Sequence, residues 1–308
     1  MPRIAVVGLG GIAQKAYLPL LAAWDGVELL VCSRRPESVA RVRERYRIER
    51  GSCDLDELLS WRPQAALVLT PSATHGALAA RLLDAGVDVF VEKPATLTSA
   101  ETAALGERAA SQGRVLMVGF NRRFAPLHVQ ARELWAGRRV GLGVFEKHRS
   151  DAAHPDLLAN FIDDTIHLVD LVRFFCGEAE AVATTQLVRD GRLVEAVALV
   201  ALESGGQAAV MTSLEAGGWR ESCSLHGDGA SLQLEAFSRL DWQQTGQQRR
   251  WREAYAAQWT PTLEARGFPQ QITHFLDCVA SRRTPASSAA EAARTQRLLE
   301  DIVARLRP

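Results

Sequence analysis

The first thirteen residues place the strongest constraint on the fold of this chain. A short apolar run at residues 4–7 ends in the pattern GxGxxA, from Gly8 to Ala13, and passes directly into a helical pattern. Gly8 permits a tight turn out of the strand, Gly10 leaves room for a pyrophosphate beside the backbone, and Ala13 lets the helix pack closely. The positive end of the helix dipole then attracts phosphate. We therefore predict a dinucleotide site rather than a plain structural turn, formed by Gly8, Gly10, Gly11, Ile12 and Ala13.

The length and net charge of the chain indicate how many domains it forms and what kind of partner it binds. With 308 residues, the chain is long for a single hydrophobic core and fits two domains better. Its 36 Lys and Arg residues balance 36 Asp and Glu residues, so the net charge points to neither nucleic acid nor an anionic membrane. We therefore expect a small molecule as the partner.

The cysteines and the apolar runs indicate the compartment. The five cysteines are widely spaced and form no CxxC pair, so we expect neither a disulfide framework nor a structural metal. No apolar run approaches the roughly 20 residues needed to span a bilayer. These features predict a cytoplasmic protein in reducing surroundings.

Residues 1–120 alternate between short apolar runs and amphipathic stretches, the pattern of a parallel sheet covered by helices. The predicted strands lie at residues 4–7, 27–32, 65–69, 87–91 and 115–118. The predicted helices lie at residues 12–23, 37–46, 55–59, 76–85 and 100–111. Successive βα-type units of this kind make a doubly wound α/β Rossmann domain.

The pattern changes after Gly119, because apolar runs now follow one another with turns between them. The predicted strands lie at residues 141–148, 181–187, 196–202, 207–213, 222–227 and 231–235. The predicted helices lie at residues 126–135, 163–175, 269–280 and 289–306, and the polar stretch 246–252 is predicted to be a loop. Residues 121–308 are thus expected to form an α+β domain with a mostly antiparallel sheet.

The second predicted strand ends in Cys32-Ser33-Arg34-Arg35, where many dinucleotide sites carry an acid that binds the ribose hydroxyls of NAD. Here the position holds no acid. A small hydroxyl followed by two guanidiniums suits the 2′-phosphate of NADP, since arginine binds phosphate oxygens through bidentate hydrogen bonds. We predict that Ser33, Arg34 and Arg35 favour NADP over NAD; the alternative is a solvated surface loop.

A lysine follows the predicted strand at residues 87–91, in the sequence Glu92-Lys93-Pro94. The carboxyl ends of such strands meet at the crevice where nucleotides bind, so we expect Lys93 beside the nicotinamide. An amine placed there can exchange a proton with a substrate oxygen. The alternative is an exposed loop lysine, and Pro94 leaves open a cis peptide bond.

Asp163 and His167 stand four residues apart at the head of a helical pattern. On a helix this spacing puts both side chains on one face. A carboxylate so placed can orient the imidazole, which makes His167 a candidate general acid or base. The alternative is an acidic helix start with an incidental histidine. No further metal ligand of suitable spacing lies nearby.

Other positions near strand ends are candidates for contact with the cofactor. Thr70, Pro71 and His75 follow the third predicted strand, and Asn121 lies at the domain junction within a basic segment. Together with Glu92 we assign them to cofactor binding. Solvent-exposed loops are the alternative.

These segments resemble the Gfo/Idh/MocA family, the group of glucose-fructose oxidoreductase and inositol dehydrogenase. The resemblance covers essentially the whole chain. Its motifs are the turn from Gly8 to Ala13, Tyr17-Leu18-Pro19, Thr70-Pro71 with His75, Glu92-Lys93-Pro94, Gly119-Phe120-Asn121-Arg122-Arg123, and Asp163 with His167. Glu-Lys-Pro joined to Asp-x-x-x-His is much more specific than either part.

The resemblance implies a Rossmann domain followed by an α+β domain whose open-faced sheet forms homodimers or homotetramers. It also implies reversible hydride transfer between nicotinamide C4 and a sugar or cyclitol carbon that bears a hydroxyl or ketone. Lys93 would bind and polarise the substrate oxygen. His167 would exchange the proton, Asp163 would orient His167, and Asn121 would lie near the nicotinamide. The cofactor would supply the hydride.

One segment departs from the family pattern. Asn160-Phe161-Ile162 stands where many members carry a glycine pair, and we expect it to alter the substrate pocket. A non-catalytic sensor of cofactor or sugar on the same fold is the alternative function. An imine or tetrapyrrole substrate is less favoured, because such relatives tend to lack the Asp-x-x-x-His pair.

Overall fold

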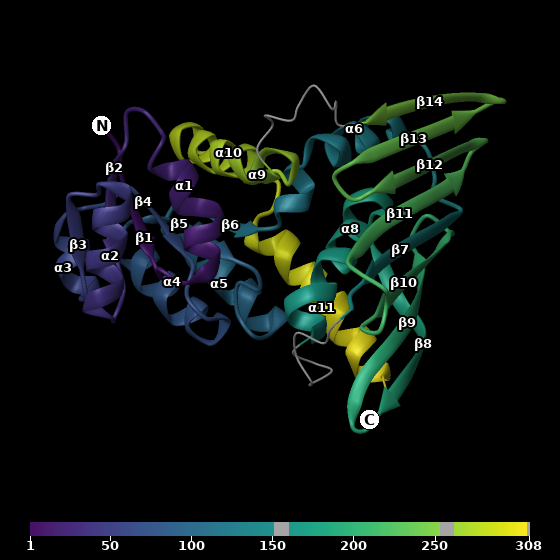
Figure 1. The fold of residues 1–308 in the computed structure, drawn as a ribbon, viewed down its shortest axis with the longest axis horizontal. Helices are drawn as coiled ribbons and strands as arrows, with labels where there is room; N and C mark the ends of the chain where they lie inside the picture. Colours follow the sequence, from purple (N-terminus) through teal and green to yellow (C-terminus); the bar gives the residue numbers. More distant parts are fainter. Residues whose placement is uncertain (151–159, 253–261, 307–308) are drawn as a thin grey trace. The chain divides into compact units, whose positions relative to one another are not determined.

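The computed structural model describes residues 1–150, 160–252 and 262–306, whose helices and strands are drawn in Figure 1. The chain divides into two compact units. The first unit contains Met1–Phe120 and Phe268–Ala293, and the second contains Asn121–Gly267 and Arg294–Pro308. Each unit is built around its own sheet.

The sheet of the first unit consists of six parallel strands. They are β1 (Arg3–Val7), β2 (Glu28–Cys32), β3 (Arg50–Ser52), β4 (Ala65–Val68), β5 (Asp88–Glu92) and β6 (Leu116–Gly119). Their order, β3-β2-β1-β4-β5-β6, confirms the predicted doubly wound architecture. β4 and β6 are buried at every residue, as their apolar sequences require. The short β3 has the sequence Arg-Gly-Ser, so no apolar signal predicts it.

The helices of the first unit begin and end close to the predicted residues, with one exception. They are η1 (Ala13–Tyr17), α1 (Leu18–Leu21), α2 (Pro36–Tyr46), α3 (Leu55–Ser60), η2 (Ser72–Thr74), α4 (His75–Asp84), α5 (Ser99–Ser111) and α10 (Phe268–Ser281). The exception is the helix predicted at residues 12–23. It begins with the π-helix η1 and continues only as the short α1, whose first turn contains Pro19.

Helix α10 joins the first unit although the predicted second domain, residues 121–308, includes it. Aromatic contacts hold it there. The ring of Phe268 meets Tyr17 edge to face at a centroid distance of 5.6 Å, and Phe275 meets Phe90 at 5.8 Å. These rings come from segments far apart in the sequence, so local patterning does not reveal the contact.

The sheet of the second unit has eight strands, in the order β14-β13-β12-β11-β7-β10-β9-β8. They are β7 (Leu142–His148), β8 (Ala179–Arg189), β9 (Arg192–Leu202), β10 (Gln207–Ser213), β11 (Arg220–Gly227), β12 (Ala230–Glu235), β13 (Arg239–Gln244) and β14 (Gln247–Arg252). β7 pairs with β10 in parallel, and every other pair is antiparallel. The predicted mostly antiparallel sheet is confirmed.

Helices accompany this sheet. They are η3 (Asn121–Phe124), α6 (Pro126–Trp135), η4 (Phe161–Thr165), α8 (Ile166–Cys176), α9 (Thr262–Ala265) and α11 (Ala289–Arg305), which supplies residues to both units. α8 is buried from Ile166 to Phe175. Its Phe175 ring lies 6.5 Å from that of Phe145 in β7. The depth of α8 sets the position of the residues at its start.

The prediction of a loop at residues 246–252 is wrong, because this stretch forms the edge strand β14. Thr245 and Gly246 both have positive φ and close a two-residue hairpin between β13 and β14. Arg250 donates hydrogen bonds of 2.6 and 3.0 Å to Asp241 across the pair. β14 is an edge strand made mostly of polar and charged residues. It therefore lacks the alternation of apolar and polar residues from which strands are predicted.

Replacing Gly8 tests the turn after β1. An alanine Cβ would lie 2.7 Å from backbone atoms of Leu69 and Thr70, at a φ of +98°. Backbone atoms cannot move aside as a side chain can, so Gly8→Ala should lose about 2–4 kcal/mol of unfolding free energy in urea. Gly11→Ala is the control, since its Cβ meets nothing within 4 Å; it should change stability by less than about 1 kcal/mol. Equal stability of Gly8→Ala and wild type would contradict this geometry.

Candidate active site

The glycine turn after β1 has the shape that a dinucleotide needs. The N–H of Gly8 donates to the carbonyl of Cys32 at 2.9 Å, which fixes the turn beside β2. A Cβ on Gly10 or Gly11 would meet no atom within 4 Å, so open space lies over the backbone where a pyrophosphate would approach. The first turn of a helix leaves its N–H groups without intrahelical partners. Ala13 is fully buried, and Ile12 beside it is 40 % exposed.

The end of β2 carries positive charge that no carboxylate of a described residue neutralises. Arg34 and Arg35 are exposed, and neither guanidinium has a hydrogen bond or ion pair with a described residue. Ser33 is half-buried, and its N–H donates to the carbonyl of Ser52 at 3.2 Å. The Ser33 hydroxyl and the two arginines therefore stand beyond the strand that flanks the glycine turn.

The loop after β4 is tied to the loop after β5 through His75. This side chain is buried, with Nδ1 2.7 Å from the carbonyl oxygen of Pro94 and Nε2 2.7 Å from that of Thr70. Carbonyl oxygens only accept, so a ring nitrogen that carries hydrogen donates to the carbonyl it faces. Both ring nitrogens thus face backbone carbonyls of the first unit, and the predicted contact of His75 with the cofactor stays a prediction. Thr70, followed by Pro71, lies at the edge of the sheet that carries Gly8.

Glu92, the last residue of β5, is buried and takes part in a network of hydrogen bonds. Its carboxylate accepts a hydrogen bond from the hydroxyl of Tyr17, and that hydroxyl accepts one of 3.0 Å from the Gln271 amide. The N–H of Lys93 also donates to Glu92 at 3.0 Å. Burial raises the pKa of Glu92 and that of Tyr17, whose phenolate the nearby carboxylate disfavours further.

Lys93 begins the loop that Glu92 anchors. It is half-buried, and its peptide bond to Pro94 is cis, the geometry that the sequence left open. In a parallel sheet all carboxyl ends lie along one edge, so β1, β4 and β5 bring Gly8, Thr70 and Lys93 to the same edge. The predicted cofactor residues of the first unit therefore gather along this edge.

In the second unit, the segment that carries Asp163 and His167 is not a plain α-helix. The π-helix η4 ends at Thr165, and α8 begins at Ile166. The Asp163 side chain is exposed, whereas His167 is buried in the first turn of α8. The prediction assumed α-helical spacing through this segment, so the role of Asp163 as the orienting partner stays a prediction.

The next residue, Asp164, is the buried acid of this turn. Arg149 donates to its carboxylate through Nε at 2.7 Å and Nη2 at 2.6 Å, and Lys147 Nζ lies 2.7 Å from Oδ1. Burial alone would raise the pKa of Asp164, but the hydrogen bonds and charges of Arg149 and Lys147 lower it. Asp164 thus joins η4 to the end of β7.

A second buried acid, Glu221 of β11, lies directly across the sheet from Lys147. Arg122 forms a fork with it, Nε to Oε1 at 2.6 Å and Nη2 to Oε2 at 2.8 Å, while Lys147 Nζ is 3.6 Å from Oε2. Burial opposes ionisation, yet Arg122 and Lys147 hold the pKa of Glu221 far below its usual range. Burial and the charge of Arg122 lower the pKa of Lys147 to about 8.

The residues after β6 also belong to this network. The Asn121 amide donates to the carbonyl of Arg266 at 2.8 Å, and its oxygen accepts from Arg122 at 3.2 Å. Arg123 binds both carboxylate oxygens of Asp170 in α8, the shortest bond being 2.7 Å. The Asn121 amide therefore forms hydrogen bonds within the second unit. The predicted position of Asn121 near the nicotinamide stays a prediction.

The sequence does not predict most of the side chains that hold the candidate site residues in place. Tyr17 enters only as part of a motif of the family resemblance. No motif contains the other four, which are Lys147, Arg149, Gln271 and Glu221. A charged residue inside an apolar strand, such as Lys147 in β7, is the one signal that could have pointed to a buried ion pair.

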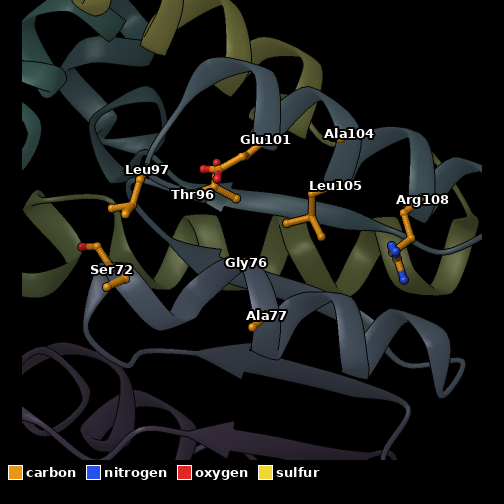
Figure 2. Close-up of a pocket in the computed structure, with 10 residues that line it drawn as sticks. Ser72, Gly76, Ala77, Thr96, Leu97, Glu101, Ala104, Leu105 and Arg108 are labelled. Atoms are coloured by element: carbon orange, nitrogen blue, oxygen red, sulfur yellow. The ribbon is translucent and has the colours of Figure 1, made fainter.

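Beyond the predicted site, the described residues form a surface pocket but neither a cluster of metal ligands nor a helix fit to cross a membrane. The pocket in Figure 2 lies between α4 and α5, and none of its lining residues is a predicted site residue. Within the described ranges, no three His, Cys, Asp or Glu side chains cluster as metal ligands would. No described helix combines the length and the apolar character that crossing a bilayer requires.

Comparison with known proteins identifies the family. A family model described as an oxidoreductase family with an NAD-binding Rossmann fold, GFO_IDH_MocA, matches residues 2–120. YceM of Salmonella typhimurium, which is named as an oxidoreductase, is 34 % identical over 97 % of this chain and 96 % of its own length. The chain belongs to the Gfo/Idh/MocA oxidoreductase family.

Two further comparisons extend this assignment. A solved Gfo/Idh/MocA oxidoreductase from Vibrio cholerae is 28 % identical with a TM-score of 0.84, covering 98 % of this chain and 97 % of that one. The scyllo-inositol 2-dehydrogenase of Bacillus subtilis is 32 % identical over 57 % of this chain and 54 % of its own length. The chain is thus a Gfo/Idh/MocA enzyme with an NAD(P)-binding Rossmann fold.

The ion pair of Glu221 can be tested by substitution and by pH. Glu221→Gln leaves Arg122 and Lys147 buried with one carboxylate fewer, so we expect a loss of about 3–5 kcal/mol of unfolding free energy at pH 7. The control is Glu235→Gln, which breaks a partly exposed pair with Arg239 and should cost less than about 1 kcal/mol.

The lowered pKa of Glu221 determines how the loss of unfolding free energy in Glu221→Gln depends on pH. A carboxyl whose folded pKa lies below its unfolded value stabilises the fold above the unfolded pKa, about 4.3 for Glu, and loses that effect as pH falls. The difference between wild type and Glu221→Gln should therefore shrink from pH 5 to pH 3 in urea titrations. A difference that stays constant over this range would contradict an ionised buried Glu221.

Proposed function

We propose that this enzyme transfers a hydride between nicotinamide C4 and a carbon that bears a hydroxyl or ketone, in a sugar, a cyclitol or a related polyhydroxylated molecule. The observation that carries the proposal is the presence, in one member of the family, of the glycine turn, Lys93 and His167. The similarity to an enzyme named scyllo-inositol 2-dehydrogenase supports this substrate class.

The residues of the first unit fit the dinucleotide that the family name implies. When bound, the cofactor supplies or accepts the hydride. The turn at Gly8 and Gly10 would hold the pyrophosphate, and the open space over Gly10 and Gly11 supports this. Ser33, Arg34 and Arg35 would bind a 2′-phosphate, which makes NADP the preferred cofactor.

Lys93 and His167 would divide the proton chemistry. Lys93 stands at the carboxyl edge of the Rossmann sheet, where its ammonium can hydrogen-bond a substrate oxygen and stabilise negative charge on it. The buried His167 imidazole can take up or return the proton of that oxygen. Asp163 would orient the ring. In the first unit, Glu92 fixes the backbone from which Lys93 projects.

The cofactor preference can be measured by titration. Wild type should bind NADPH at least about 10-fold more tightly than NADH, a difference of ~1.4 kcal/mol, and Arg34→Asp should abolish most of that ratio by repelling the 2′-phosphate. Arg62→Asp is a control of equal charge change, because Arg62 precedes β4 at the opposite end of the parallel sheet. Equal affinity of wild type for the two cofactors would refute the preference.

Catalysis can be tested with sugars, inositols and keto-sugars in the presence of NADP(H). Lys93→Met and His167→Ala should each lower kcat/KM by ~10²-fold or more, the usual scale of general acid–base assistance, while the Kd for NADPH changes little. His226→Ala, at an exposed position of β11, is the control and should keep wild-type turnover. Cofactor binding without turnover across the screen would instead favour a sensor.

A further inference from the structure

The second unit gathers more positive than negative charge around Asp164 and Glu221. Arg122, Lys147 and Arg149 bind these two carboxylates, as described above. A fourth cation, Arg266, lies beside Arg122, because both guanidiniums lie over the Phe237 ring, at 4.9 Å for Arg266 and 5.7 Å for Arg122. Burial and then Arg122 lower the pKa of Arg266, while Glu221 opposes them. Among the described residues of this cluster, four cations accompany two buried carboxylates, and adding the exposed Asp163 still leaves an excess of positive charge.

Arg266 is the cation of this cluster that pairs with no carboxylate in the described part of the chain. Its guanidinium lies over the ring of Phe237 at 4.9 Å and over that of Trp219 at 5.4 Å. The two rings stack on each other at 6.5 Å with planes 11° apart. Among the described residues, no hydrogen bond or ion pair reaches the Arg266 guanidinium. Aromatic faces hold its position but do not neutralise its charge.

Arg149 lies at the same end of the sheet. It follows His148, which pairs with Arg220, and Trp219 precedes Arg220. Arg149 and Trp219 therefore leave the β7–β11 pair together, and the charge of Arg149 also acts on Arg266. The Arg149 side chain remains 32 % exposed although it binds Asp164.

Trp219 adds an apolar surface at this place. Its side chain is among the exposed large hydrophobic groups, at 44 % exposure, and Phe237 supports it from beneath. Two partly accessible guanidiniums beside an indole make a surface suited to a small molecule with a charged group and an apolar ring face.

We propose that Arg149 and Arg266 bind an oxyanion of the substrate, a carboxylate or a phosphate, so that the enzyme acts on an acidic polyhydroxylated molecule rather than a neutral one. This inference rests on the proposed function. An oxyanion between the two guanidiniums offsets their mutual repulsion and supplies the acceptors that Arg266 lacks. Arg122 is buried against Glu221 and Lys147 against Asp164, so neither is assigned to the ligand.

The position of Asp164 ties this anion site to the candidate catalytic histidine. Asp164 binds Arg149 and stands three residues before His167. A substrate held by its oxyanion at Arg149 therefore places its hydroxyl-bearing carbons near the start of α8. The anion site would act in orientation as well as affinity.

The first test measures anion binding without any turnover. Inorganic phosphate is titrated calorimetrically into the full-length protein, wild type and Arg266→Gln, at constant ionic strength. We expect phosphate binding that weakens at least 10-fold in Arg266→Gln. Arg138→Gln is the matched control, because Arg138 also lies over a tryptophan ring, Trp242, at 5.0 Å and loses the same charge. Absent binding to wild type, or equal binding to all three proteins, would overturn the proposal.

The second test separates the anion site from the proposed reaction. kcat/KM is compared for D-glucuronate, D-glucose 6-phosphate and neutral D-glucose, and the preferred acid shows which oxyanion the site takes. We expect a preference of at least 10-fold for an acid, lost in Arg266→Gln mainly through KM. Turnover of D-glucose alone, without phosphate binding, would overturn the anion site and leave the proposed function standing. Phosphate binding that Arg266→Gln abolishes, without turnover of any sugar, would support the anion site and count against the proposed function.

Discussion

Buried carboxylates paired with buried cations determine the geometry of the second unit. Removing an ion from water costs several kcal/mol, so Asp164 and Glu221 stay ionised in the interior only because Lys147, Arg149 and Arg122 surround them. Each pair joins different elements: η4 to β7, and η3 to β11. These pairs therefore fix where η4 ends and α8 begins, and with it the position of His167. The excess of cations over carboxylates among the described residues of this cluster is the basis of the proposed anion site.

The first unit holds a buried carboxylate with hydrogen bonds rather than with buried cations. Glu92 is buried at the end of β5, where Tyr17 and the N–H of Lys93 donate to it. Gln271 on α10 completes the contact and ties a distant helix to this strand end. In each unit a candidate proton-transfer residue thus follows a buried carboxylate within three residues of the chain. Rigid support of this kind keeps reacting groups in place without a contribution from the substrate.

The sequence predicts the Rossmann sheet well because each of its strands but one carries its own apolar signal. It fails where a structure depends on partners far away. β14 is a polar edge strand that needs β13 to form, and η4 widens the helix at Asp163 in a way that residue spacing does not show. The contact of Tyr17 with Gln271 spans most of the chain. Sequence motifs identify the candidate site residues. Most of the side chains that support them are identified only by the three-dimensional structure, because they lie far from the motifs in the sequence.

The account is tested most directly by a crystal structure of the protein with NADP and D-glucuronate bound. It predicts the 2′-phosphate at Ser33, Arg34 and Arg35, a sugar hydroxyl hydrogen-bonded to Lys93 Nζ and to His167, and the carboxylate between the guanidiniums of Arg149 and Arg266. A sugar that binds with its carboxylate away from both guanidiniums, or with no hydroxyl at Lys93 or His167, would contradict it.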